Sequence, residues 1–312
     1  MTYPFNKVVY IHDLFSSQPL SIEFHVGLTT FLGPNGSGKS QVLRALKDQL
    51  EDKAHKRKRL LAAGRLSQLE TFRSNYDGMK GINYEQASFD GTNLREYRHQ
   101  SESAIGDLHT LSVRPDIQIK VSERLITLFK RNIFIDWDAG NLKIKFSTLA
   151  GAPYSAAREE SGLLHLVTIL TALYDDEVGV LLLDEPEVSL HPQLQAFLFQ
   201  EIKRVAGGPA NRSKKMIVIA THSTELLDVL VPEDLTKIVF LKDTQTPLVQ
   251  IDPQAAELVR ELLTRLGQAH KAAFFSSKPF LVCYLTLLFS FSSINKFILS
   301  QTQYTLIIYI AC

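Results

Sequence analysis

The sequence of 312 residues predicts an α/β fold built around a mostly parallel sheet. Three short apolar runs, at 28–32, 180–183 and 216–220, lack polar alternation, which is typical of strands buried on both faces. A segment with helical periodicity follows each run within a few residues. Alternation of strands and helices in this order favours parallel strands joined by helical crossovers.

A glycine-rich string follows the first run. GPNGSGKS at 33–40 fits the pattern G-x-x-x-x-G-K-[ST], and it lies between a strand and a helix as a phosphate-binding loop requires. Its glycines let backbone N–H groups turn toward phosphate oxygens, at the positive end of the next helix. An ordinary glycine turn is the alternative, but all eight positions match. The residues predicted to bind nucleotide are Gly33, Pro34, Asn35, Gly36, Ser37, Gly38, Lys39 and Ser40.

Two carboxylates stand at the end of the second run, in LLLDEPE at 181–187. Ligands of open parallel sheets bind at the carboxyl ends of the strands. We expect Asp184 to hold Mg²⁺ together with the Ser40 hydroxyl, while Lys39 reaches the β- and γ-phosphates. Glu185 is then the expected catalytic residue, which orients or deprotonates the attacking water. Taken alone, an acidic pair at this place is more often a solvated strand end.

The third run ends in Thr221-His222-Ser223. A single histidine is more often structural, but His222 follows a parallel strand at the same predicted edge of the sheet as Glu185. We therefore expect it to contact the γ-phosphate, as phosphoryl transfer depends on positioning and electrostatics.

These strings in this order resemble the ABC ATPase superfamily, within it the soluble branch of the overcoming-lysogenization-defect (OLD) nucleases and the SMC- and RecF-like ATPases. The stretch EPEVSLHPQLQ at 185–195 carries the finer resemblance, with His191 and Pro192 at the D-loop position. The resemblance implies a P-loop NTPase with an ABC-type core, an antiparallel β subdomain and a helical insert. It also implies ATP and Mg²⁺ as cofactors, ATPase activity, and a head-to-tail homodimer that forms on ATP.

The resemblance also places a signature sequence about two dozen residues before the Walker B aspartate. Ser161-Gly162 lies 23 residues before Asp184, but Leu163 and Leu164 replace the later signature residues. Ser161, with Arg158 as a further candidate, would then contact the partner's γ-phosphate. The alternative is that Ser161 is an ordinary N-cap before a helix over 163–174; the helical pattern as a whole is expected over 161–174.

The other elements follow from local patterns. Residues 8–15 and 21–26 alternate as antiparallel strands do, and an insert at about 51–110 breaks the pattern. A turn is expected at 138–141. Tyr10 and Phe15, candidates for stacking on adenine, and Gln86, a candidate Q-loop residue, are better explained as core or surface. The remaining expected elements are helices at 191–205 and 223–230 and strands at 178–183 and 237–241.

A basic run, KAHKRKR at 53–59, opens the insert. It could contact DNA phosphates, but we favour the solvated face of a helix whose leucines point inward. A net charge of +1 gives no global attraction to nucleic acid, and two cysteines without metal spacing suit a reducing cytoplasm. We expect a cytoplasmic protein without a membrane association, with DNA or a partner protein as further binding candidates.

The C-terminal part departs from the resemblance. The ATPase domain is expected over 1–250 and a helical linker over 251–282, leading toward a Toprim domain that is missing. Residues 283–312 contain one charged side chain, Lys296, and the last acidic residue of the chain is Glu261. Metal-dependent nuclease chemistry needs carboxylates. We therefore expect no nuclease activity and interpret the apolar tail as aberrant, with a membrane anchor as the alternative.

The leading interpretation is an ATPase of the OLD-like nuclease group that acts in DNA repair or phage defence. One alternative is the nucleotide-binding subunit of an ABC transporter, which the partial signature and the SLHP segment disfavour. Another is an ATP-dependent switch that orders a partner protein without hydrolysis.

Overall fold

The computed structural model describes residues 4–12, 14–50, 57–66, 87–88, 102, 104–138, 141–156, 159–207, 214–222, 238–241, 243–245 and 249–250. All of them belong to one structural unit, which comprises 1–223 and 236–251. The predictions for the helix at 223–230, the linker at 251–282 and the tail at 283–312 lie outside the described residues. Within these residues, no helix combines the length and the apolar character that crossing a membrane requires.

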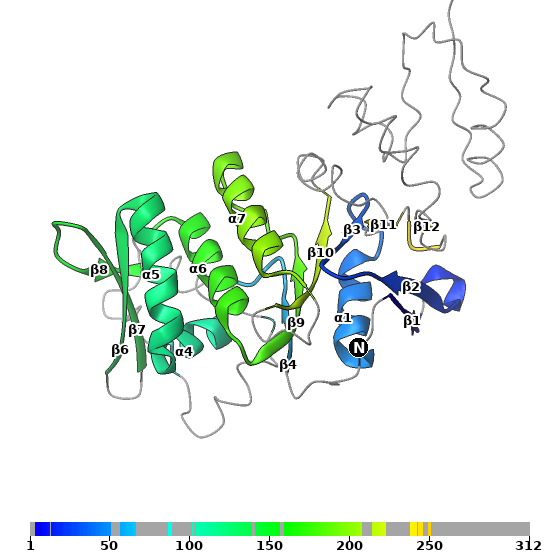
Figure 1. Cartoon of the computed structure of the whole chain (residues 1–312), viewed down its shortest axis with the longest axis horizontal. Helices are drawn as coiled ribbons and strands as arrows, with labels where there is room; N and C mark the ends of the chain where they lie inside the picture. The colour runs from blue at the N-terminus through cyan, green and yellow to red at the C-terminus, as the bar shows by residue number, and fades with distance from the viewer. Residues whose placement is uncertain are drawn as a thin grey trace, which may run out of the picture. The chain divides into compact units, whose positions relative to one another are not determined.

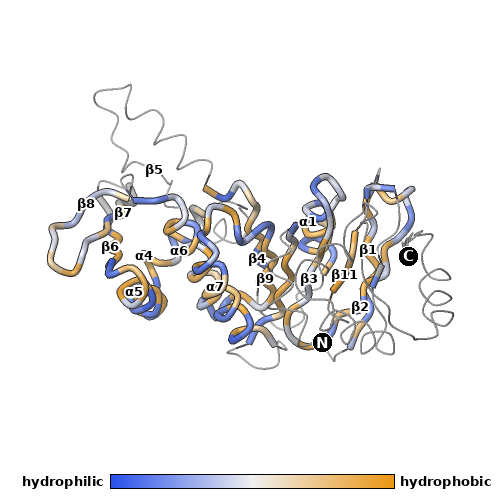
Figure 2. The backbone as a smooth tube through the Cα atoms, turned by 90° about the horizontal axis from the view of Figure 1, so that it is seen from above, coloured by the Kyte–Doolittle hydropathy of each residue, from blue (hydrophilic) through white to orange (hydrophobic). Residues whose placement is uncertain are grey.

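A six-stranded sheet forms the centre of this unit (Figure 1). Its neighbouring strands pair in parallel except for the edge pair β11–β12. Every residue of β3, β9 and β10 is buried, as the apolar runs predict, and Figure 2 shows β9 in the colour of hydrophobic residues. The strand order is β12 (Val249–Gln250), β11 (Ile238–Phe240), β3 (Leu28–Leu32), β10 (Met216–Thr221), β9 (Val178–Asp184) and β4 (Arg57–Leu61).

An antiparallel pair and one helix pack with the six-stranded sheet in the main hydrophobic core. Strands β1 (Phe5–Val9) and β2 (Leu20–Phe24) pair antiparallel, as expected. Strand β2 lies close to the predicted 21–26, but β1 shares only residues 8–9 with the predicted strand at 8–15, and Phe15 begins a short 3-10 helix. Helix α1 (Lys39–Gln49) follows β3 and contacts β4, β9 and β10. Its buried side chains, spaced three and four residues apart, join the main hydrophobic core with β1 and β2.

Helices and a hairpin form a second group. Helix α6 (Ser161–Tyr174) is buried over almost its whole length and contacts α4, α5, α7 and β9. The predicted helix at 161–174 is confirmed, and the turn at 138–141 joins β6 to β7. Helix α5 lies along β6 in Figure 1. The other elements are α4 (Ile105–Val113), α5 (Pro115–Phe129), β5 (Ala87–Ser88), β6 (Arg131–Asp138), β7 (Asn141–Thr148), β8 (Tyr154–Ser155) and α7 (Pro192–Val205).

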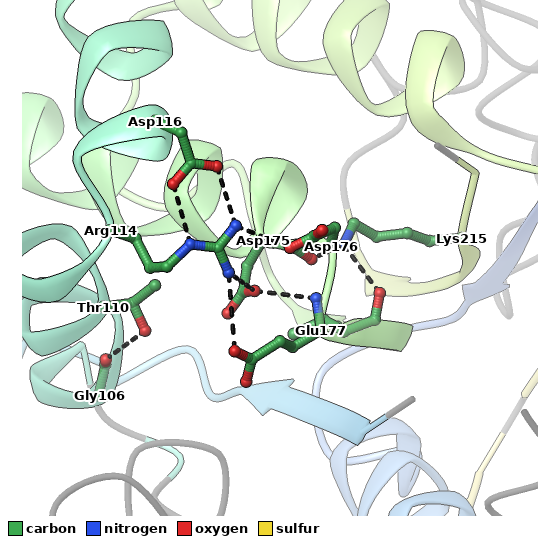
Figure 3. Close-up of polar contacts among 9 residues, drawn as sticks. Gly106, Thr110, Arg114, Asp116, Asp175, Asp176, Glu177 and Lys215 are labelled. Carbon is green, nitrogen blue, oxygen red and sulfur yellow. Dashed lines mark hydrogen bonds and ion pairs between the residues drawn. The ribbon is translucent and has the colours of Figure 1, made fainter. Parts of the chain in front are cut away.

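Arg114, between α4 and α5, ties these helices to the loop that enters β9 (Figure 3). Its guanidinium donates to Asp116 at 2.9 Å and to Asp176 at 2.8 Å, and it lies 3.7 Å from Asp175. Lys215 donates to backbone carbonyls of the same loop, at Asp175 and, at 2.8 Å, at Val178. The contacts of Arg114 and Lys215 thus fix the loop before β9. They also fix the start of β9, the strand that carries the acidic motif.

The structure of the basic run differs from the predicted solvated helix face. Arg57–Leu61 is a strand, β4, which pairs with β9, so the helix-face interpretation is wrong for these residues. Arg59 is 1% exposed and forms a buried ion pair with Asp107 of α4. A buried, paired guanidinium is not available to DNA phosphates. Residues 53–56 of the run lie outside the described residues.

Candidate functional site

The register of three neighbouring strands brings the sequence motifs together. Thr221 of β10 pairs with Leu32 of β3, and Ala220 pairs with Asp184 of β9. Because the strands are parallel, the glycine-rich loop, the acidic turn and the segment at Thr221-His222 all begin at the same edge of the sheet. This is the edge at which ligands of such sheets bind.

The loop at 33–40 has the backbone that its glycines predict. Gly36 and Gly38 have φ values of 80° and 90°, which residues with side chains rarely adopt. Position 33 requires glycine for a steric reason, because a Cβ atom there would lie 2.1 Å from the carbonyl oxygen of Leu241, just after β11. Pro34 is half-buried, whereas Asn35 and Gly36 are exposed. The hydroxyl of Ser37 is buried and has no hydrogen-bond partner among the described residues.

Lys39 opens α1, and its ammonium group turns back to the loop. The Nζ atom donates to the carbonyls of Gly33 at 2.9 Å and Pro34 at 2.8 Å. Burial lowers the pKa of Lys39, while Glu185 and Asp184 oppose this shift. The side chain thus lies between the phosphate-binding loop and the acidic turn, where a bound phosphate would need a cation.

Asp184 is the residue at this edge best suited to a divalent cation. It is 5% exposed, and its Oδ1 atom is buried with no hydrogen-bond partner among the described residues. Burial raises the pKa of Asp184, and a hydrogen bond with Ser40 counters the shift. A buried carboxylate oxygen without a donor, next to a hydroxyl, fits a Mg²⁺ ion shared with substrate phosphates. The predicted pair of ligands, Ser40 and Asp184, therefore lies together.

Glu185 and His222 meet at the ends of β9 and β10. The Nδ1 atom of His222 lies 3.0 Å from Oε1 of Glu185, and both side chains are partly exposed. Since a carboxylate only accepts hydrogen bonds, Nδ1 carries the proton in this contact. The Nε2 atom of the same ring is then left for another partner. The two predicted catalytic residues are thus in direct contact.

Ser161 is the first residue of α6, and the N-cap position is taken by Glu160. The N-cap interpretation of Ser161 is therefore wrong by one residue. Gly162 packs against the D-loop segment, because a Cβ atom there would lie 2.5 Å from the carbonyl oxygen of Ser189. His191 instead caps α7, where it accepts from the N–H of Gln193 at 3.4 Å. Arg158 lies outside the described residues.

Two buried residues of this region were missed by the sequence analysis. Glu187 is 7% exposed and accepts a hydrogen bond from the hydroxyl of Thr221, and burial raises its pKa. Arg65 follows β4, is 1% exposed, and donates to backbone carbonyls of the acidic turn. The string LLLDEPE contains Glu187, but nothing in the sequence around Arg65 indicates its place.

The two aromatic candidates for adenine stacking are placed differently. Phe15 is fully buried, and its ring would lie 3.0 Å from a Cβ atom on Gly38, so it packs under the loop as a core residue. Tyr10 is 63% exposed, and its N–H donates to the side chain of Gln49. Gln86, the Q-loop candidate, lies outside the described residues.

One family model matches the chain over residues 49–228, which is more than half of its length. That family is described as "AAA domain, putative AbiEii toxin, Type IV TA system". The matched stretch includes Ser161, Asp184, Glu185 and His222. No curated protein matches the chain.

Solved structures of ATPase domains resemble the chain at low identity. An SMC head bound to the C-terminal winged-helix domain of ScpA is 13% identical, with 81% of this chain and 100% of that chain covered and a TM-score of 0.47. The SMC head domain from Thermotoga maritima is 14% identical, with 79% and 99% covered and a TM-score of 0.42. A dimeric bacterial ABC transporter cassette is 15% identical, with 79% and 96% covered and a TM-score of 0.37. Similarity at this level says nothing further about function.

Proposed function

We propose that this chain binds ATP and hydrolyses it at the edge of the sheet formed by β3, β10 and β9. The premise is that the chain belongs to the AAA domain family matched over residues 49–228. The chain is a P-loop ATPase of the ABC-like type. The observation that carries the proposal is the pairing of Leu32 with Thr221 and of Ala220 with Asp184. This register gathers a phosphate-binding loop, a buried carboxylate and the contact between Glu185 and His222.

Each residue of the edge has a role in this proposal. The backbone of the loop at 33–40 and the ammonium group of Lys39 hold the phosphates, so that Lys39 exchanges its carbonyl partners for phosphate oxygens. Glu185 accepts a proton from the attacking water, or orients it. His222, held by Glu185 through Nδ1, offers Nε2 to the γ-phosphate. Proximity of these groups supplies most of the rate enhancement in phosphoryl transfer.

Asp184 and Ser40 are the residues that would hold Mg²⁺. When bound, Mg²⁺ neutralises charge on the phosphate oxygens of the nucleotide. Asp184 would use its Oδ1 atom, which has no donor among the described residues. Burial is the main cause of the raised pKa of Asp184, and a cation beside this carboxylate would oppose that shift.

We also propose that two copies assemble head to tail on ATP, with Ser161 facing the nucleotide of the partner. Contact between Gly162 and Ser189 supports this, because it joins the start of α6 to the segment at the D-loop position. The finer role that we propose is that of the OLD-like group in DNA repair or phage defence. Family membership supports a defence role, since the family description names a toxin–antitoxin system. DNA and a partner protein are further binding candidates in this proposal.

The test is a phosphate-release assay on the whole chain, with ATP and Mg²⁺, in the presence and absence of DNA. Turnover that disappears in Glu185→Gln would support the ATPase. Binding of ATP without any turnover, with and without DNA, would instead favour the alternative of a non-hydrolysing switch. Light scattering of Glu185→Gln at saturating ATP tests the assembly, and a monomer there would contradict the head-to-tail dimer.

A further inference from the structure

The turn that carries Asp184 and Glu185 is held by a single buried arginine. The Nη1 atom of Arg65 donates to the carbonyl of Asp184 at 3.2 Å and to that of Ala62 at 3.0 Å. Its Nη2 atom donates to the carbonyls of Glu185 at 3.4 Å and Pro186 at 3.3 Å. One guanidinium group therefore binds three consecutive carbonyls of the turn and one carbonyl of its own loop.

These bonds stabilise an unusual backbone conformation. Glu185 has a φ of 46°, in the left-handed region, which costs a residue with a side chain roughly 1 kcal/mol. The N–H of Glu185 donates to the carbonyl of Ala220 at 2.8 Å, and its own carbonyl accepts from Arg65. The N–H of Glu185 is thus fixed by β10, and its carbonyl is shared between Arg65 and the N–H of Val188, which donates at 3.2 Å. The direction of its carboxylate toward His222 depends on this conformation.

The charge of Arg65 is compensated within the same region. Burial lowers the pKa of Arg65 to about 10, and Glu187 is the carboxylate that opposes this shift most strongly. The guanidinium therefore stays charged at neutral pH. Glu187 also accepts from the hydroxyl of Thr221, the residue before His222. A buried set of contacts thus runs from Arg65 through the acidic turn to the segment of His222.

We propose that Arg65 is a positioning residue of the hydrolytic site, which holds the turn at 184–186 so that Glu185 points at the attacking water. This rests on the proposed ATPase function, and Arg65 itself is not a contact of the nucleotide. A planar guanidinium carries five donors in a fixed fork, whereas a lysine ammonium acts as a point charge. Lysine at this position keeps the charge but cannot serve carbonyls on both sides. Hydrolysis therefore depends on Arg65, while ATP affinity depends on the loop at 33–40.

The experiment compares Arg65→Lys with Arg59→Lys in the whole chain. The two arginines are equally buried at 1% exposure, but Arg59 donates to Asp107 and to the carbonyl of Leu60. Steady-state phosphate release gives kcat, equilibrium binding of a fluorescent ATP analogue gives Kd, and thermal unfolding gives the stability of each variant. We expect kcat of Arg65→Lys to fall about 10- to 100-fold, as for small misplacements of catalytic groups, with Kd within about 3-fold of the wild type. Arg59→Lys should retain its kcat even where its thermal midpoint falls.

Several results would overturn the proposal. Equal kcat values for Arg65→Lys and Arg59→Lys would do so, as would a loss of ATP affinity as large as the loss of kcat. A second variant, Arg65→Gln, keeps two N–H donors and is measured in the same way. If both variants at 65 fail to fold while Arg59→Lys folds, Arg65 serves stability alone and the proposal is wrong. An inactive wild type would contradict the ATPase function instead, which separates the two conclusions.

Discussion

Nδ1 of His222 lies 3.0 Å from Oε1 of Glu185, although the two residues are 37 positions apart in the chain. The contact exists because β9 and β10 are parallel neighbours that end together. This hydrogen bond therefore joins the residue proposed to activate water, Glu185, to the residue proposed to contact the γ-phosphate, His222. Loss of either side chain should leave the other without its partner.

Lys39→Ala should weaken ATP binding by about 10- to 150-fold, because a buried charge-assisted contact to phosphate contributes roughly 1.5–3 kcal/mol. Isothermal titration with a non-hydrolysable ATP analogue measures the change. Lys120→Ala, at an exposed position on α5, is the matched control and should bind as the wild type does. Unchanged affinity in Lys39→Ala would contradict the placement of the phosphates.

Glu185→Gln should bind ATP normally but lower kcat by roughly 10²- to 10⁴-fold, since an amide cannot accept the proton of the attacking water. Single-turnover phosphate release separates this loss from any change in binding. Glu123→Gln, on the exposed surface of α5, removes one carboxylate elsewhere and should leave kcat unchanged. A kcat close to that of the wild type would exclude Glu185 as the residue that activates water.

Gly33→Ala should destabilise the protein by roughly 1–3 kcal/mol, because its Cβ would lie 2.1 Å from the carbonyl of Leu241. Thermal unfolding should show a midpoint lower by several degrees. Gly64→Ala is the matched control, as a Cβ there meets no atom within 4 Å. If the two alanine variants unfold at the same temperature, β11 is not packed against the loop as described.

His165 should make the protein less stable in mild acid. Burial, assisted by the positive charge of Arg65, lowers the pKa of His165 to about 3 from the usual 6.5. The unfolded chain therefore binds a proton between about pH 6.5 and 3 that the folded chain does not, and stability falls as pH falls through that window. From this group we expect the free energy of unfolding at pH 5 to lie ~2 kcal/mol below that at pH 7.

Urea unfolding at both pH values, for the wild type and for His165→Leu, tests this prediction. The relevant quantity is the difference between the two pH values, which does not depend on how well leucine packs. His165→Leu should reduce this difference, although Asp184 and Glu187, whose pKa values are raised, contribute with the opposite sign. An identical pH difference in both proteins would show that His165 is not buried in its neutral form.

The parts of the fold that could be predicted from sequence are those whose cause is local. The strands at 28–32 and 216–220 carry no charged residue and are buried throughout, and the string at 33–40 matches the phosphate-binding pattern at every position. Strand β4 was missed because its Arg57-Lys-Arg59 start is typical of a solvated surface. Only Asp107, 48 positions further along, makes Arg59 a buried residue.

The candidate site likewise contains residues that the sequence predicts and residues that depend on distant contacts. The motif residues could be predicted, because phosphate and Mg²⁺ chemistry restricts their types and their spacing. Arg65 could not, since its acceptors are backbone carbonyls 119 to 121 positions away, and a carbonyl leaves no mark on the sequence. The alternative interpretation placed the N-cap at Ser161, one position too late, because helix ends depend on backbone angles that a sequence does not display.

The left-handed backbone of Glu185 sets stability and activity against each other. Glycine or asparagine tolerates a φ of 46° far better than glutamate does, so either substitution should raise the thermal midpoint. The same substitutions would remove the carboxylate. A selection for thermal resistance alone would therefore enrich inactive variants at this position, and any effort to make the protein more robust has to screen for turnover at the same time.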